Sequence, residues 1–384
     1  MTGGRLYGHS LHKIIPNFWE EAPIERKVLR ETVTFMTKES EVSLDVKSEK
    51  WNDAPSFTVL RSEFDAWLAA KAEEAGAMVA AGVRVDELIK ENGKVIGVRC
   101  DEDEMQANVV IAADGVNPLL AQRAGIRSEL LPKHVATGAK EVIELPKQVI
   151  EDRFNLTEDT GAAQLFVGEC TRGLQGGGFL YTNKNSISLG LVITAEEFAH
   201  SQYSIVDLME EFKMHPAIRP LIEGGKVVEY SGHLVPEGGL GMMPPLVHDG
   251  LLIVGDAAGL VLNTGYMVRG MDLAIASGEA AAKAVIAAKE AEDYSKQGLS
   301  LYQKELDNSF VMQDLKTYSK APAFMENKRI FGLYPSLVED MMVNLFKVDG
   351  VPAKPLLKEA VGTIKHYGGL MQLARDAWKG VSSL

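Results

Sequence analysis

A chain of 384 residues that is 46% hydrophobic and 24% charged has the composition of a soluble globular protein of two or three domains. Its net charge of -13 argues against a nucleic-acid partner, because phosphate binding needs a basic face. The two cysteines, Cys100 and Cys170, exclude a disulfide framework and cannot supply the thiolates of an iron–sulfur cluster. Without a signal peptide or a long apolar run, a cytoplasmic location is expected.

The first half of the chain predicts one helix followed by three strands. A helix is expected over residues 62–75, starting at Ser62 and ending at Gly76. Residues 77–88 read as a strand, and residues 94–100 form its return strand across the turn Asn92-Gly93. The run 107–113 is almost continuously apolar, as in a strand buried on both faces.

The second half predicts an insertion with its own sheet and then a helical tail. Residues 179–182 and 186–192 read as an antiparallel hairpin, and a helix capped by Ser204 is expected over 205–214. A buried strand follows at 250–254, then an alanine-rich helix over 270–288. We therefore predict an α/β, doubly wound domain split into residues 1–129 and 247–290, with an α+β domain over 130–246 between the parts and a helical region over 291–384.

Two strand ends carry candidate binding residues. Gly255-Asp256-Ala257-Ala258-Gly259 follows a buried strand, where glycines permit close approach of a ligand and a carboxylate can accept hydrogen bonds from sugar or ribityl hydroxyls. Asp114-Gly115 ends another apolar run in the same way, and ligands of open α/β sheets bind at that edge. Each motif also has a simpler interpretation: 255–259 fits a strand-end turn with Asp256 as a helix cap, and Asp114-Gly115 fits a turn.

Further candidates surround these motifs. Asn263, Gly265, Gly270 and Met271 lead into the alanine-rich helix, whose amino end stabilises negative charge such as that of a reduced flavin. Arg269 either adds to that effect or is a surface residue. Arg61 either reaches a cofactor phosphate or is solvated. Val83 is a candidate contact in the strand predicted over 77–88. Gly176-Gly177-Gly178 is expected to permit a tight bend or a close approach to a ring system.

Three segments resemble motifs of glutathione-reductase-type FAD proteins. Val59-Leu60-Arg61 is similar to the arginine before their first long helix, Ala113-Asp114-Gly115 to their middle Asp-Gly motif, and 255–259 to their second FAD-binding motif. Within that superfamily the segments 3–7, 176–183 and 269–274 are similar to the FixC family, which is related to electron-transfer-flavoprotein:quinone oxidoreductases and to geranylgeranyl reductases. The resemblance implies a Rossmann-like FAD domain in which Asp256 holds the ribityl chain. It also implies that Gly265 and Gly270, with Gly3, Gly4 and Arg5, lie beside the isoalloxazine ring.

The resemblance also implies partners. FAD in this family takes electrons from an electron-transfer flavoprotein and passes them to a quinone or a ferredoxin-like acceptor. Because no cysteine follows Cys170, an iron–sulfur cluster is expected on a separate ferredoxin-like subunit. A peripheral position on the inner face of a membrane would serve a quinone. The apolar segment 240–246 is a candidate for that contact, or else part of the core.

One departure from the family pattern leaves alternatives open. The glycine spacing Gly-x-Gly-x-x-Gly of the first strand–helix–strand unit is absent from this sequence, so the FAD domain is expected to lack the element that binds the pyrophosphate. A lipid reductase similar to geranylgeranyl reductases is one alternative function, and a remnant that holds no FAD is another.

Overall fold

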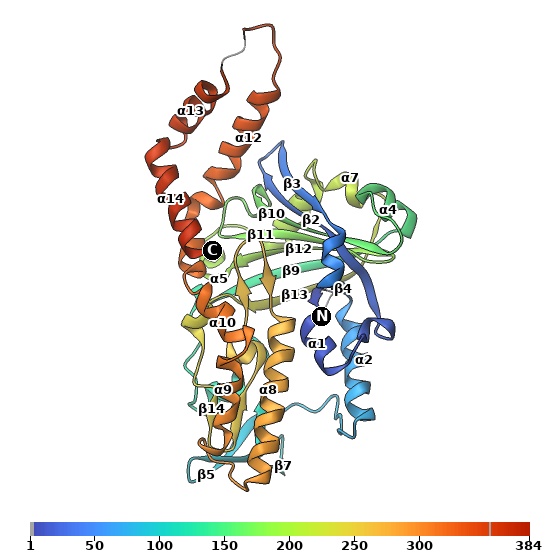
Figure 1. The fold of residues 1–384 in the computed structure, drawn as a ribbon, viewed down its shortest axis with the longest axis vertical. Coiled ribbons are helices and arrows are strands. Elements are labelled where there is room, and N and C mark those ends of the chain that lie inside the picture. Colours follow the sequence, from blue (N-terminus) through green and yellow to red (C-terminus); the bar gives the residue numbers. More distant parts are fainter. Residues whose placement is uncertain (1–3, 353–354) are drawn as a thin grey trace.

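The computed structural model describes residues 4–352 and 355–384, and its largest element is a nine-stranded sheet (Figure 1). The strands lie in the order β1 (Gly4–Tyr7), β4 (Ser56–Val59), β2 (Ile24–Met36), β10 (Thr160–Gly168), β11 (Gly176–Thr182), β12 (Ser186–Thr194), β9 (Val135–Glu144) and β13 (Lys226–Pro236), and β3 (Glu41–Lys47) pairs with β2. Among the described strands of this sheet, only β2 and β10 pair in parallel. The sheet thus joins segments on both sides of residue 129, and the predicted four-part domain division stays a prediction.

Helices cover one face of this sheet. They are α4 (Lys147–Phe154), α6 (Ile205–Met214) and α7 (Arg219–Ile222). Figure 1 shows α4 and α7 on the same side of the strands. Their apolar residues pack on alternate positions of β12, where Ile187, Leu189, Leu191 and Ile193 are fully buried. The Ser204 hydroxyl accepts a 3.2 Å hydrogen bond from the Val206 amide at the start of α6, so the predicted helix and its cap are confirmed.

The other half of the molecule is built around a three-stranded sheet. Its strands are β14 (Val247–His248), β15 (Leu251–Ile253) and β8 (Val110–Ala112), and β8 and β15 run parallel. The long helix α8 (Met271–Glu290), with α9 (Leu301–Asp307) and α10 (Phe310–Thr317), shares a core with these strands. The Tyr302 hydroxyl donates a 2.9 Å hydrogen bond to the Ile253 carbonyl and fixes α9 against β15.

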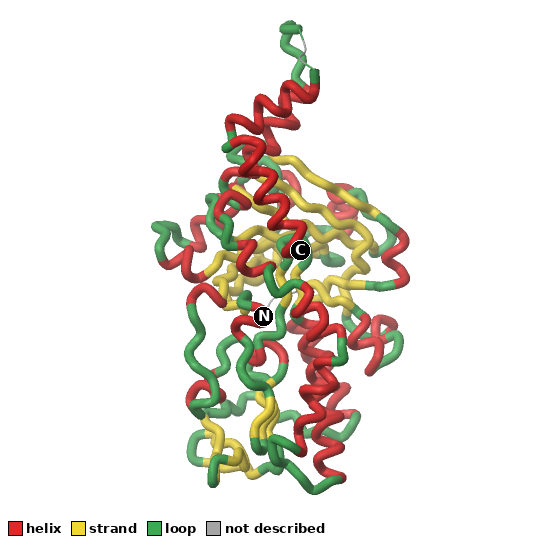
Figure 2. Tube along the Cα trace, turned by 60° about the vertical axis from the view of Figure 1, so that its left-hand side comes forward, coloured by secondary structure: helices red, strands yellow, loops and turns green. Residues whose placement is uncertain are grey.

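A second small sheet follows helix α2 (Arg61–Glu74). It consists of β5 (Glu87–Glu91), β6 (Lys94–Cys100) and β7 (Asp103–Gln106). Asn92 and Gly93 both have positive φ angles, 52° and 85°, as a two-residue hairpin turn requires, and the predicted hairpin is confirmed. Figure 2 shows the large sheet as one yellow layer, with the smaller sheets at the opposite end of the molecule.

Three predictions about local structure were wrong. Residues 77–86 form no strand and are mostly exposed, so strand structure begins only at Glu87. The run 107–113 is not buried on both faces, because Ile111 is 42% exposed and Val109 and Val110 are only partly buried. Gly176–Gly178 lie within β11, so the predicted tight bend is wrong, whereas their close approach to a ring system stays a prediction. A Cβ on Gly178 would stand 2.7 Å from the Phe212 ring, so packing excludes a side chain there.

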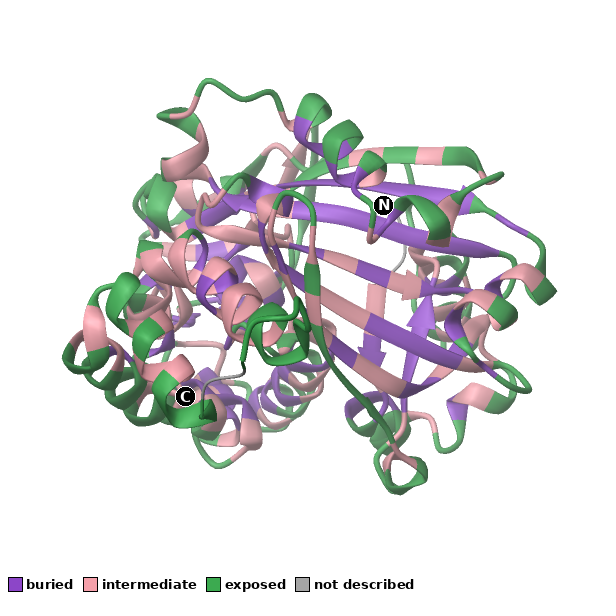
Figure 3. Ribbon diagram, turned by 90° about the horizontal axis from the view of Figure 1, so that it is seen from above, coloured by how far each residue is buried: buried purple, intermediate pink, exposed green. Residues whose placement is uncertain are grey.

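Helices end the chain, as the sequence predicts. The short helices α1 (His9–Ile14), α3 (Leu119–Arg123) and α5 (Ala195–Ala199) come earlier, and α11 (Ala321–Met325), α12 (Leu333–Phe346), α13 (Leu356–His366) and α14 (Gly369–Ser383) form the C-terminal region. Figure 3 shows the large sheet mostly buried and the helices near the C-terminus mostly exposed. None of the helices in the described part of the chain is both long and apolar enough to cross a bilayer. In the segment 240–246, Met242 and Leu246 are buried in the core.

Candidate functional site

The two predicted strand-end motifs lie side by side. β8 and β15 pair in register, with Ala112 opposite Ile253, and the Val254 amide donates a 3.0 Å hydrogen bond to the Ala112 carbonyl. Both strands end at the same carboxyl edge of the sheet, so Asp114 follows β8 and Asp256 follows β15 at that edge. The structure therefore gathers these residues at the edge where open α/β sheets bind ligands, although their contact with FAD stays a prediction.

The turn after β15 depends on its glycines. Gly255 and Gly259 have φ angles of 57° and 77°, in the left-handed region that other residues avoid. A Cβ on Gly255 would lie 3.3 Å from the Ala274 methyl group in α8, and one on Gly259 would lie 3.1 Å from Met242 Cγ. The Gly255 amide also donates a 3.0 Å hydrogen bond to the Ser277 hydroxyl. The turn is thus held tightly against α8.

Asp256 projects from this turn with a carboxylate that makes no hydrogen bond within residues 4–352 and 355–384. Burial raises the pKa of Asp256, and the positive charge of Arg61 lowers it in part. A partly buried carboxylate without a donor has lost water without gaining a partner, which costs stability unless a ligand donates hydrogen bonds. The vicinal hydroxyls of a ribityl chain fit this need.

The two carboxylate oxygens of Asp114 differ in their hydrogen bonding. Its Oδ2 accepts a 3.1 Å hydrogen bond from the Leu120 amide in the first turn of α3, so this oxygen already has a donor in the protein. Its Oδ1 is buried and has no hydrogen-bond partner in the described part of the chain. This orphaned acceptor lies at the same edge as Asp256. The residues present therefore fit a hydroxyl-rich cofactor such as FAD.

The sequence analysis missed Arg127, which braces the same turn. Its guanidinium is buried and donates hydrogen bonds to the carbonyl oxygens of Ala257 and, at 3.0 Å, Met242. Burial lowers the pKa of Arg127, and the nearby Asp114 carboxylate opposes that shift. No local pattern marks this arginine, because both carbonyls lie more than a hundred residues further along the chain.

The remaining candidates collect at the amino end of α8. Gly270 is the residue before this helix, and the Met271 methyl group lies 3.5 Å from the position that a Cβ on Gly4 would take. The Asn263 side chain accepts a 2.9 Å hydrogen bond from the amide of Gly265, whose φ of 85° suits glycine. These residues form the loop that precedes α8. The amino end of this 20-residue helix, which is the positive end of its dipole, lies next to β1.

Three predicted arginines already have partners in the protein. Arg5 forms an ion pair with Glu31 and donates to the Ser56 hydroxyl at 3.0 Å, and Arg61 holds Asp65 in two hydrogen bonds of 2.6 and 2.7 Å. Arg269 is only 11% exposed and pairs with Asp272 and Asp314 at 2.6 Å, so its interpretation as a surface residue was wrong.

Two further candidates stay predictions. Val83 is 56% exposed in the loop that replaces the predicted strand. The segment 77–86 is a mostly exposed loop and not the predicted strand, so the contact of Val83 with the cofactor stays a prediction. Gly3 lies outside the described residues.

Glu237, directly after β13, is a second functional candidate that the sequence analysis missed. Its two carboxylate oxygens accept hydrogen bonds of 3.3 Å each from Asn263 Nδ2 and the Thr194 hydroxyl. Burial raises the pKa of Glu237 from 4.5 to about 7, with those two hydrogen bonds opposing the shift. The Glu237 carboxylate, whose pKa is about 7, thus contacts the loop that carries Gly265 through its hydrogen bond with Asn263.

We expect Glu237 to make stability fall as the pH rises. Since its pKa is higher in the folded protein than in the unfolded chain, its contribution is fully present below pH 4.5 and is lost as the pH passes about 7. The slope between these limits would be at most about 1.4 kcal/mol per pH unit. Thermal melts from pH 5 to 8 should show this fall in the wild type and a flatter profile in Glu237→Gln. Identical profiles would contradict the assignment.

Comparisons with known proteins agree with these features. The family model "FAD dependent oxidoreductase" matches residues 59–284, and the model "ETF-QO/FixC family C-terminal domain" matches residues 321–384. The chain is 54% identical over 387 aligned positions to "Probable electron transfer flavoprotein-quinone oxidoreductase YdiS" of Escherichia coli K12, covering 100% of this chain and 90% of the relative. It is 49% identical to "Protein FixC" of Escherichia coli O157:H7, with the same coverage, and 40% identical to "Protein FixC" of Bradyrhizobium diazoefficiens, covering 97% and 87%.

Solved structures show the same fold at low sequence identity. A geranylgeranyl bacteriochlorophyll reductase-like protein of Thermoplasma acidophilum superposes with a TM-score of 0.68 and 22% identity, covering 97% of this chain and 88% of that one. CtdE in complex with FAD superposes with a TM-score of 0.59 and 14% identity, covering 97% and 90%. The α/β fold of FAD-dependent oxidoreductases predicted from the sequence is confirmed.

Proposed function

Since the chain belongs to the family of FixC proteins and electron-transfer-flavoprotein:quinone oxidoreductases, and is thus an FAD-dependent oxidoreductase, we propose that it takes electrons from an electron-transfer flavoprotein and delivers them to a quinone. The observation that carries this proposal is the shared sheet edge. There, the Asp256 carboxylate and Asp114 Oδ1 both lack donors within the described residues. When bound, FAD supplies the redox chemistry, because it exchanges electrons both singly and in pairs.

The residues of the chain bind and orient this cofactor in the proposal. Asp256 accepts hydrogen bonds from the ribityl hydroxyls, and Asp114 accepts one through its free Oδ1. Gly255 and Gly259 allow the backbone to approach closely, and the amino end of α8 stabilises negative charge on the ring. Arg127 holds the turn in place from behind.

A ferredoxin-like subunit is a further proposed partner. Cys170 is buried, and burial raises the pKa of its thiol to about 12, so it is not a ready metal ligand. Cys100 alone cannot hold a cluster. Electron transfer through an iron–sulfur centre would therefore use a cluster on another chain. A quinone acceptor also implies a peripheral position at a membrane.

The test measures flavin reduction and reoxidation directly. Purified protein with added FAD should show the flavin absorption band near ~450 nm, bleach when mixed with reduced electron-transfer flavoprotein, and recover on addition of a short-chain quinone. A protein that shows no flavin band after FAD addition would overturn the proposal. Recovery with a polyprenyl lipid but not with a quinone would favour the lipid reductase instead.

Membrane association gives a separate prediction. If quinone is the acceptor, we expect part of the protein to float with liposomes of zwitterionic lipid, because a net charge of -13 disfavours anionic lipid and attachment would rest on apolar contacts. Flotation gradients at low and high salt would measure this fraction. Protein that stays wholly in the dense fractions under both conditions would count against access to a membrane quinone.

A further inference from the structure

Lys140 is a buried lysine without an acidic partner at hydrogen-bonding distance. It lies in β9 and is 4% exposed, and the structure gives its ammonium group no ion pair or hydrogen bond to any residue in 4–352 or 355–384. Its closest recorded contact is the Phe179 ring of β11, whose centroid is 5.4 Å from Nζ. Buried charges in proteins are normally paired, so an unpaired one marks a candidate functional group.

The side chain points away from the helices that cover the sheet. Its neighbour Glu141 forms an ion pair of 3.1 Å with Lys213 of α6, and side chains alternate along a strand. Lys140 therefore lies on the opposite face, which we call the inner face. Phe179 and Tyr181, stacked with centroids 5.3 Å apart, lie beside it on that face.

The inner face is electrostatically connected to the sheet edge that carries Asp256. The positive charge of Arg61, at the start of α2, lowers the pKa values of both Lys140 and Asp256. The charge of Lys140 in turn lowers the pKa of His233 in β13, and the charge of Glu229 raises the pKa of Lys140. Burial, the largest cause, lowers the pKa of Lys140 to about 7, so this amine changes charge near neutral pH.

We propose that the Lys140 side chain faces the bound flavin from the inner face of the sheet and stabilises the negative charge that the flavin gains on reduction. This inference rests on the proposed flavin function and adds to it a residue that sets the flavin potential. Two electrons and one proton leave the reduced flavin with one negative charge. That charge favours protonated Lys140, so a Lys140 that is neutral before reduction takes up one further proton from solvent.

The experiment is a redox titration with dithionite of the FAD-loaded wild type, Lys140→Met and Lys140→Arg. It needs neither an electron-transfer flavoprotein nor a quinone, so failure of those partners leaves the result unaffected. Below pH 7 we expect Lys140→Met to shift the equilibrium about tenfold toward oxidised flavin, about 30 mV lower in potential, and Lys140→Arg to restore most of the shift. Lys47→Met, an exposed lysine of β3, is the control and should leave the potential unchanged.

The pH dependence separates this role from a structural one. Above pH 7 the wild-type potential should fall about twice as steeply with pH as that of Lys140→Met, because two protons rather than one accompany two electrons. Equal potentials and equal slopes in the two proteins would overturn the inference.

A measurement without FAD keeps the inference testable if the cofactor does not bind. Because an unpaired buried cation costs stability, Lys140→Met should melt at a higher temperature than the FAD-free wild type. A lower melting temperature would show that the amine is needed for the fold, and would also overturn the inference.

Discussion

Replacing Asp256 by alanine is expected to lower the affinity for FAD roughly tenfold to a hundredfold. Its carboxylate has no donor within the described residues and lies at the shared edge of β8 and β15, so the hydrogen bonds it would make to a ribityl chain have no substitute. Hydrogen bonds to a charged group contribute about 1.5–3 kcal/mol. Titration of the FAD-free protein with FAD, followed by flavin fluorescence, measures the change.

Two further variants make the Asp256 test specific. Asp256→Asn keeps the shape and one acceptor oxygen, and should lose less affinity than Asp256→Ala. Asp103→Ala removes an exposed carboxylate from β7 at matched charge and should bind FAD as the wild type does. If Asp256→Ala binds FAD with unchanged affinity, Asp256 is only a turn residue and the cofactor assignment of this motif is wrong.

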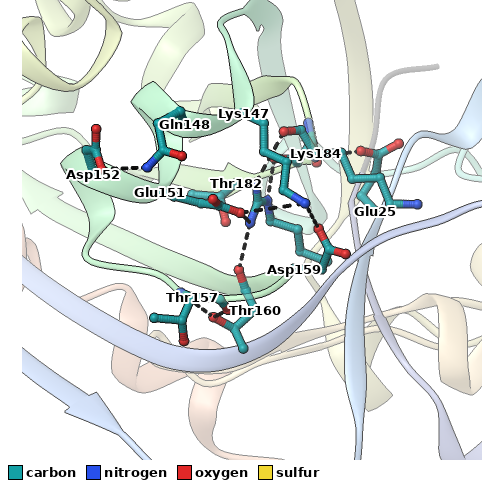
Figure 4. A network of polar contacts seen from close by, with 12 residues as sticks. Glu25, Lys147, Gln148, Glu151, Asp152, Thr157, Asp159, Thr160, Thr182 and Lys184 are labelled. Carbon is teal, nitrogen blue, oxygen red and sulfur yellow. Dashed lines mark hydrogen bonds and ion pairs between the residues drawn. The ribbon is translucent and has the colours of Figure 1, made fainter.

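Arg26→Met is expected to be among the most destabilising substitutions in the chain, by about 3–5 kcal/mol. Arg26 is fully buried in the large sheet, and its guanidinium donates hydrogen bonds to the carbonyl oxygens of Asn183 (2.7 Å), Thr160 (3.1 Å) and Lys184 (3.2 Å) and to the Glu151 carboxylate (3.2 Å). Figure 4 shows the polar network around these groups. Without the guanidinium, the buried Asn183 carbonyl loses this donor, as do the part-buried carbonyls of Thr160 and Lys184 and the Glu151 carboxylate.

The rim of the same network supplies the control for Arg26. Lys147 pairs with Asp159 at 2.5 Å but is half-exposed, so Lys147→Met should cost less than about 1 kcal/mol. Urea unfolding of both variants, followed by tryptophan fluorescence and circular dichroism, compares the two costs. Equal midpoints for Arg26→Met and the wild type would show that the sheet does not depend on this arginine.

Short-range patterns in the sequence predicted their structures well. The Ser204 cap with the helix after it, and the Asn92-Gly93 turn, involve residues a few positions apart, so their geometry follows from local hydrogen bonding and backbone preference. The strand ends at Asp114 and Asp256 were found in the same way, because small residues after an apolar strand are visible locally. Their meeting at one edge needed only the rule that parallel strands share a carboxyl edge.

Residues whose roles depend on distant partners were misjudged or missed. Arg269 fits a surface position in the sequence, because its partner Asp314 lies 45 residues away and contacts it only in the folded protein. Arg127, Glu237 and Lys140 carry no local signal, because what distinguishes each is burial beside groups far away in the chain. The segment 77–86 shows the converse error, since its apolar residues suit a strand but no neighbouring strand pairs with them among the described residues.

The sequence by itself therefore determined the fold class, the family motifs and which residue types lie at the sheet edge. Only the tertiary structure decided which charged side chains are paired within the protein and which are left without a partner. It satisfies Arg5, Arg61 and Arg269 with internal carboxylates, and it leaves Asp256 and Lys140 without such partners in the described chain. The physical reason is that propensity and periodicity act over a few residues, whereas burial and charge pairing depend on contacts between distant segments.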